Sequence, residues 1–88
     1  MTNKDYVLSL FKKWQDNTFS DSDLIDELEV FNSGFSGDDI WFRFFKNDTM
    51  VTTIRDIEND LKDQNRNYRI ECIDMALKDA DNFQLNYD

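Results

Sequence analysis

The scarcity of helix-breaking residues is the feature that most limits how this chain can fold. Its 88 residues include no proline, and its two glycines lie close together at Gly34 and Gly37. Proline and glycine are the strongest local interrupters of regular structure, so most of the chain is free to be helical. The sequence therefore predicts an all-α fold, a small compact bundle of about five short helices. Residues 1–88 are expected to form a single small acidic helical domain with one modest core.

The spacing of apolar residues predicts three of these helices, over residues 3–16, 49–63 and 67–81. The first begins at about Asn3 or Lys4, with Asn3 as its candidate N-cap. The three apolar faces are formed by Val7, Leu10, Phe11 and Trp14, by Met50, Ile54, Ile57 and Leu61, and by Ile70, Ile73, Leu77 and Ala80.

A six-residue phrase occurs twice with little change, as FSDSDL at residues 19–24 and as FSGDDI at residues 35–40. Each copy places a serine where an N-cap belongs and an aspartate three residues later, close to the pattern of a capping box. The flanking apolar residues, such as Phe19 and Leu24, are spaced as a hydrophobic staple. We therefore expect two further helices that begin after Ser20 and Ser36, with Gly34 as the C′ glycine that ends the first of them.

Two segments admit more than one structure. Residues 40–45, Ile-Trp-Phe-Arg-Phe-Phe, fit either a helix or an alternating strand, and the preceding cap favours the helix. In residues 82–87 the apolar side chains of Phe83, Leu85 and Tyr87 alternate, which is typical of a short strand or an extended arm. If both segments were strands, the fold would be α+β.

The composition argues against an enzyme and against a metal or cofactor site. The chain has no histidine, which excludes Ser-His arrangements and His-bearing zinc sites. Its single cysteine, Cys72, cannot form an internal disulfide, and two glycines cannot build a phosphate loop. A calcium loop counted from Asp16 fails because its sixth position is Asp21 where glycine is required. With no signal-like segment and no long apolar run, the chain is expected to be cytoplasmic and without a membrane span.

Charge is the outstanding bulk property. Nineteen acidic residues against ten basic ones give a formal net charge of −9. This charge disfavours direct binding to nucleic acid or anionic lipid, and it favours a basic protein partner. Between Trp14 and Phe42 there are eight carboxylates and no Lys or Arg.

Two acidic surfaces follow from this distribution. On the helix after Ser20, three carboxylates point outward around an exposed Val30, like a binding hot spot with a charged rim. On the helix over 49–63, three aspartates repeat at about 5 Å, a spacing of the same order as that of nucleic-acid phosphates. The alternatives are a Val30 that packs on a neighbouring helix or is harmlessly exposed, and a solvated face moderated by Arg55 and Lys62. The candidate partner-binding residues are Asp23, Asp26, Glu29, Val30, Asp38, Asp39, Asp56, Asp60 and Asp63.

In size, charge and helical content the chain resembles phage anti-restriction and anti-CRISPR proteins. It is also similar to the acidic immunity proteins of nuclease bacteriocins, although it lacks their typical Tyr-Tyr-Pro sequence. The resemblance implies a non-catalytic inhibitor, in some cases a DNA mimic, that binds the basic nucleic-acid-binding surface of a nuclease or similar enzyme.

The alternative function is a helical adaptor or oligomerisation module that binds through apolar contacts. Its surface would be the second apolar face of the last helix, formed by Tyr68, Cys72 and Met75, or the alternating tail over 82–87. That second face is also expected if the helix is sandwiched in the fold. Whether the protein is a monomer or a homodimer stays open.

Overall fold

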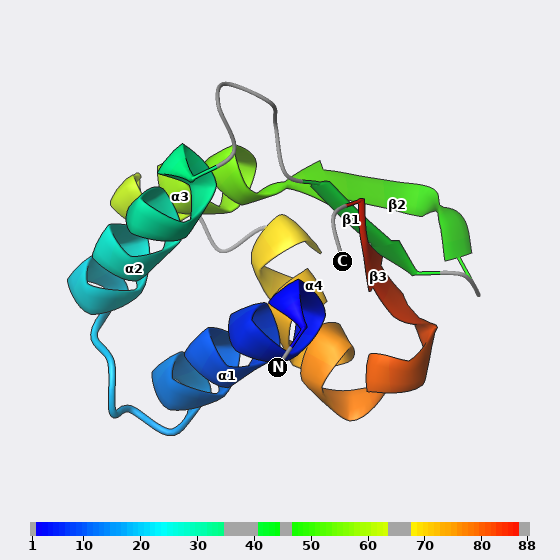
Figure 1. Ribbon diagram of the computed structural model, residues 1–88, viewed down its shortest axis with the longest axis horizontal. Helices are drawn as coiled ribbons and strands as arrows, with labels where there is room; N and C mark the ends of the chain where they lie inside the picture. Colours follow the sequence, from blue (N-terminus) through cyan, green and yellow to red (C-terminus); the bar gives the residue numbers. More distant parts are fainter. Residues whose placement is uncertain (1, 35–40, 45–46, 64–67, 87–88) are drawn as a thin grey trace.

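The computed structural model describes residues 2–34, 41–44, 47–63 and 68–86. These residues contain four α-helices and three β-strands. Their order along the chain is α1 (Asn3–Gln15), α2 (Asp21–Ser33), β1 (Trp41–Phe44), β2 (Asn47–Thr53), α3 (Ile54–Lys62), α4 (Tyr68–Lys78), a 3-10 helix (Ala80–Asn82) and β3 (Phe83–Leu85) (Figure 1). The prediction of a small, mainly helical domain with a short strand near the C-terminus is confirmed.

The first helix is capped one residue earlier than predicted. The side-chain oxygen of Thr2 accepts a hydrogen bond from the backbone N–H of Asp5 at 3.0 Å, so Thr2 and not Asn3 is the N-cap. At the other end Asn17 has a positive φ of 64°, in the left-handed region that asparagine tolerates better than most residues. The N–H of Thr18 donates to the carbonyl of Lys13 at 2.8 Å, which completes a Schellman-type end.

The second helix begins as its sequence predicts. Ser20 is the N-cap, and its Oγ accepts the backbone N–H of Asp23 at 3.1 Å. In return, Asp23 Oδ2 accepts the backbone N–H of Ser20 at 3.0 Å, so the capping box is complete. The helix ends at Gly34 as expected, but Gly34 is the C-cap, with a right-handed φ of −71°. The prediction that Gly34 ends this helix is confirmed, but its assignment to the C′ position is wrong.

The segments around residue 45 form strands rather than helices. Strand β1 pairs with β2 in an antiparallel hairpin and with β3 on its other edge, which gives the sheet order β2-β1-β3. The preference for helix over residues 40–45 is therefore wrong for 41–44, and the α+β alternative describes the arrangement observed. The predicted helix start after Ser36 lies outside the described residues. Pairing with β3, about 40 residues away in sequence, decides the structure of β1.

The helix predicted over 49–63 begins at Ile54, because the preceding residues belong to β2. Thr53 ends the strand and caps the helix, with its side-chain oxygen accepting the N–H of Asp56 at 3.0 Å. The β-branched run Val51-Thr52-Thr53 suits a strand better than a helix. The helix predicted over 67–81 is observed as α4, and it ends three residues earlier, at Lys78.

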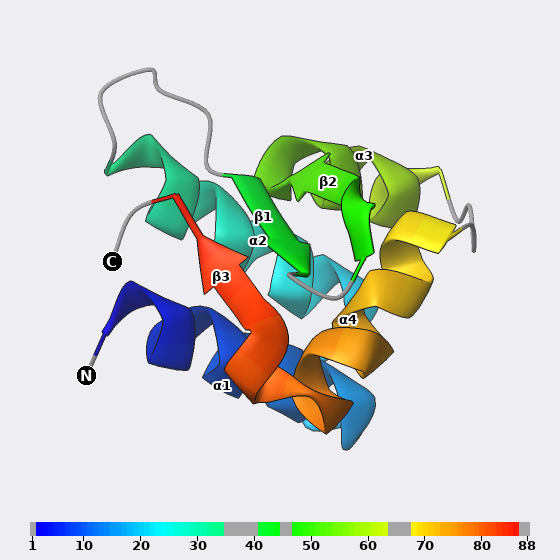
Figure 2. The same ribbon diagram turned by 90° about the vertical axis from the view of Figure 1, so that its right-hand side faces the viewer.

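One apolar core joins all four helices to β3. Its buried members are Val7, Leu10, Phe11, Leu24, Leu28, Ile54, Ile57, Leu61, Ile73, Ala76, Phe83 and Leu85. The sheet lies on one side of the molecule, at the right of Figure 1, and faces the viewer in Figure 2. Helix α3 packs against both α2 and α4. Among the described residues, no helix is both long enough and apolar enough to cross a membrane.

Candidate partner-binding surface

Helix α2 presents an acidic surface to solvent. Its thirteen residues carry five carboxylates and no Lys or Arg. Leu24 and Leu28 are fully buried, which fixes the rotation of the helix and turns the opposite side outward. Asp23, Asp26 and Glu29 are all exposed, as predicted. We call these three carboxylates, together with Val30, the acidic face of α2.

Val30 is the apolar member of the acidic face, and it is 68% exposed. The alternative in which it packs on a neighbouring helix is therefore wrong. Val30 follows Asp26 by four residues, so the two side chains occupy the same side of the helix. Since isolated exposed apolar residues are common, exposure alone does not make a binding site. Val30 is a candidate contact residue because it lies among exposed carboxylates.

Two of the three carboxylates of the acidic face already have partners in the fold. Asp23 belongs to the capping box described above. Glu29 Oε1 accepts a hydrogen bond from Lys62 Nζ of α3 at 2.7 Å, with both side chains about half exposed. The hydrogen bond that Lys62 donates to Glu29 is the largest cause that raises the pKa of Lys62 above its ordinary value. This ion pair links α2 to α3 across the surface.

Glu58, which the sequence analysis did not single out, lies buried between the same two helices. It is 6% exposed, and no donor within the described part of the chain reaches its Oε1. Burial raises the pKa of Glu58, and the negative charge of Glu29 raises it further, whereas Lys62 and Arg55 act in the opposite direction. A signal was present in the sequence: Glu58 follows Ile54 by four residues and precedes Leu61 by three, so it falls on the buried stripe.

The ladder of aspartates predicted on α3 does not form. Asp63 is exposed, but Asp56 is partly buried and Asp60 is 4% exposed, so Asp60 belongs to the interior. Helix α3 is contacted by α2 and by α4, so less of its surface faces solvent than in a helix with a single neighbour. The prediction of a DNA-like row of charges on this helix is therefore wrong. The candidate residues Asp38 and Asp39 lie outside the described residues.

The surfaces suggested for an apolar adaptor are only partly accessible. In the C-terminal tail, Phe83 and Leu85 are buried at 1% and 4% exposure because β3 pairs with β1 in the protein's own sheet. On α4, Met75 is 36% exposed. The side chains of Tyr68 and Cys72 are not among those that the structure describes. Tyr87 also lies outside the described residues.

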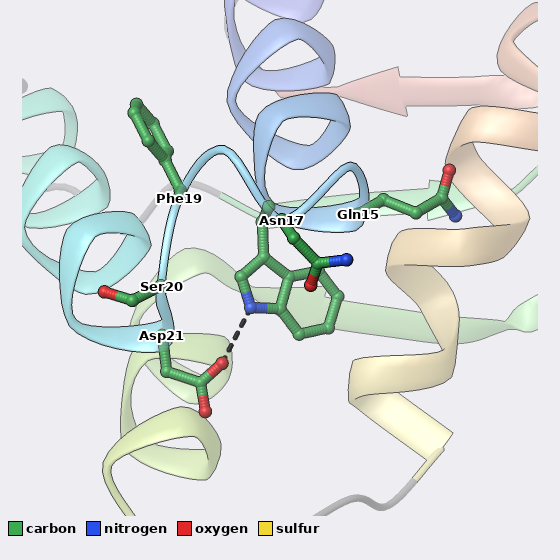
Figure 3. Close-up of a pocket in the computed structure, with 6 residues that line it drawn as sticks. Gln15, Asn17, Phe19, Ser20 and Asp21 are labelled. Carbon is green, nitrogen blue, oxygen red and sulfur yellow. Dashed lines mark hydrogen bonds between the residues drawn. The ribbon is translucent and has the colours of Figure 1, made fainter.

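A shallow hollow lies where the chain turns from α1 into α2. It has a volume of about 360 Å³ and is lined by Trp14, Gln15, Asn17, Phe19, Ser20 and Asp21. The indole Nε1 of Trp14 donates to Asp21 Oδ1 at 2.8 Å, and this bond ties the end of α1 to the start of α2 (Figure 3). The Phe19 side chain points away from Asp21 and Asn17 in Figure 3.

In the described ranges no three Cys, Asp or Glu side chains come together in a group that could hold a metal ion. Comparison of this chain with protein-family models, with curated proteins and with solved structures gives no match.

Proposed function

We propose that this protein is a non-catalytic inhibitor that binds the basic, nucleic-acid-binding surface of a nuclease or similar enzyme. The observation that carries the proposal is the acidic face of α2, in which exposed carboxylates surround an exposed valine on a helix without a single basic residue. A surface of this kind is complementary in charge to a groove that binds phosphates.

The charge of the whole chain supports the same proposal. A net charge of −9 on 88 residues generates a long-range negative potential that draws basic partners and repels nucleic acid. Rim charges speed association, while an apolar residue at the centre of the contact excludes water and slows dissociation. In this proposal Asp26 and Glu29 guide the partner, and Val30 contributes the apolar contact. Asp38 and Asp39 remain candidate partner-binding residues of this proposal.

The test begins with capture of a partner by the tagged protein from bacterial lysate at low salt, and the bound enzyme is identified by mass spectrometry. The purified enzyme is then assayed for DNA binding in the presence of the inhibitor. The wild-type protein is expected to displace the DNA, and this competition should weaken as salt rises, because screening shortens the range of surface charges.

The variant Asp26→Lys is suited to this assay because Asp26 is exposed and takes no part in the capping box. Asp23 is a poor choice, since its loss would also weaken the start of α2. The matched control is Asp81→Lys, an exposed acid after α4 whose substitution changes the net charge by the same two units, from −9 to −7. Asp26→Lys should weaken competition by about tenfold, the effect of one close charge pair. Equal effects of the two variants, or capture of only salt-resistant partners, would contradict the proposal.

A further inference from the structure

The contact between α2 and α3 holds two carboxylates and one lysine. Glu29 comes from α2, whereas Glu58 and Lys62 lie one turn apart on α3, which packs beside α2 (Figure 1). Lys62 Nζ is 2.7 Å from Glu29 Oε1. The charge of Glu58 acts on Lys62, and the charges of Glu29 and Lys62 both act on Glu58. The three groups therefore form one electrostatic cluster, which also includes Asp26 through its action on Lys62.

This cluster has more acceptors than donors. Glu58 is more than nine-tenths buried, and its Oε1 receives no hydrogen bond from the described residues. A buried carboxylate oxygen without a donor is costly, because the water that it lost on folding has not been replaced. Lys62 directs its hydrogen bond to Glu29 instead. A second cation with several donors would therefore find an unsatisfied oxygen beside an ion pair.

We infer that Glu29 and Glu58 form a receptor for an arginine side chain of the basic partner, and that Lys62 occupies this receptor in the free protein. The inference rests on the proposed function, because it specifies which contact on the acidic face a basic partner makes. Arginine fits better than lysine, since its planar guanidinium carries five donors and can bridge two carboxylates. Binding of the guanidinium satisfies Glu58 Oε1 and releases the Lys62 ammonium into water.

Lys62 is able to move aside without disturbing the core. Its side chain is 50% exposed, and it lies in the last turn of α3, next to the C-cap Asp63. Lysine has a flexible four-carbon stem and a strongly hydrated head group, so solvent readily accepts it. Glu58 is buried in the free protein, and in this proposal the Lys62 side chain leaves before the guanidinium reaches it. The lysine thus acts as an internal competitor that weakens the binding of unspecific cations.

The experiment uses an arginine octapeptide and a lysine octapeptide as probes, with binding measured at low salt by calorimetry. Lys62→Ala is compared with Lys78→Ala, which also removes one lysine from an exposed ion pair, with Asp74 at 2.9 Å. Both variants change the net charge by the same unit, from −9 to −10. Lys62→Ala should bind the arginine peptide about tenfold more tightly than Lys78→Ala, the value of one charge-assisted hydrogen bond. The affinity for the lysine peptide should increase less.

Adding Glu58→Gln to Lys62→Ala should abolish this gain, and circular dichroism checks that the double variant remains folded. In the wild-type protein, NMR titration with the arginine peptide should shift the amide signals of Glu29, Glu58 and Lys62, a result that needs no variant. If Lys62→Ala and Lys78→Ala bind equally, or if the gain survives Glu58→Gln, the receptor is refuted while the acidic face remains a binding surface. Failure of both peptides to bind the wild type would overturn the proposed function as well.

Discussion

Glu58 shows how packing changes the chemistry of a single side chain. In sequence it is one of nineteen acidic residues, but in the fold it is 6% exposed and lies beside the Glu29–Lys62 ion pair. Burial disfavours the ionised form of a carboxyl group, and a neighbouring carboxylate does the same. Both effects raise the pKa of Glu58 above its ordinary value of 4.5. Asp74 shows the opposite case, because a hydrogen bond from Lys78 lowers its pKa.

These pKa directions predict how Glu58→Gln changes stability with pH. With its pKa raised in the folded state, Glu58 keeps its proton at pH values where the unfolded chain has lost it. Its contribution to stability is therefore present below pH 4.5 and is lost as the pH rises through the folded pKa. Relative to the wild type, Glu58→Gln should gain stability as the pH rises above 4.5, because the variant has no carboxyl group to ionise at this buried position. Urea unfolding followed by tryptophan fluorescence measures this difference.

Asp74→Asn is the control of opposite sign. The lowered pKa of Asp74 adds stability above its ordinary value of 3.8, and this stability is lost as the pH falls through the folded pKa. The variant should therefore be less stable than the wild type at neutral pH, and the difference should shrink in acid. Parallel pH profiles for wild type and Glu58→Gln would show that Glu58 is not perturbed by burial.

At the scale of secondary-structure elements, the start of helix α2 is set by residues close in sequence, whereas strand β1 is set by pairing with other strands. Helix α2 contains its own start signal, since Ser20 and Asp23 exchange two hydrogen bonds across three residues. Strand β1 has no such local signal, and its structure depends on hydrogen bonds to β2 and β3 on its two edges. A single substitution at the N-cap can therefore test how much this start signal contributes to stability.

Ser20→Ala tests the capping box of α2. The substitution removes the oxygen that accepts the Asp23 N–H, so the free energy of unfolding should fall by about 1 kcal/mol. Such a loss lowers the midpoint of thermal unfolding by roughly 4–8 °C in a domain of this size. Ser22→Ala is the matched control, because Ser22 is exposed in the same first turn and is not the N-cap. Equal midpoints for the two variants would mean that the box contributes little to stability.

At the scale of the whole molecule, net charge opposes the compact state. Ion pairs such as Lys12–Asp16, Glu29–Lys62 and Asp74–Lys78 offset part of the negative charge. They are exposed, and exposed pairs contribute little to stability. The excess of nine negative charges is spread over a body about 30 × 28 × 24 Å, so most of these charges lie within one Debye length of others at low salt. Self-repulsion should therefore outweigh the attraction within the pairs.

Added salt is accordingly expected to stabilise the protein. Raising the ionic strength from about 0.01 M to about 0.15 M shortens the Debye length from about 30 Å to about 8 Å. The midpoint of thermal unfolding should rise by about 4–8 °C for each kcal/mol of repulsion that is screened. Asp81→Lys, with a net charge of −7, should show a smaller rise than the wild type at −9. A midpoint that falls with salt would mean that the ion pairs dominate.

Local sequence patterns are sufficient to predict the features that depend on neighbours within one or two helical turns. These include the cap at Ser20, the buried Leu24 and Leu28, and the exposed acidic face around Val30. Capping and helical periodicity act over three or four residues, so a local pattern is sufficient to predict them. The net charge, and with it the proposed class of partner, also follows from composition alone.

Tertiary structure decided the rest. Residues 41–44 fit both a helical and an alternating period, and only pairing with β2 and with the distant β3 selects the strand. The sequence predicts Asp60 to be a surface charge on an amphipathic helix, yet it is buried. Its burial follows from the packing of α2 and α4 around α3, and a periodic pattern shows which side of a helix is apolar but not how many neighbours cover it.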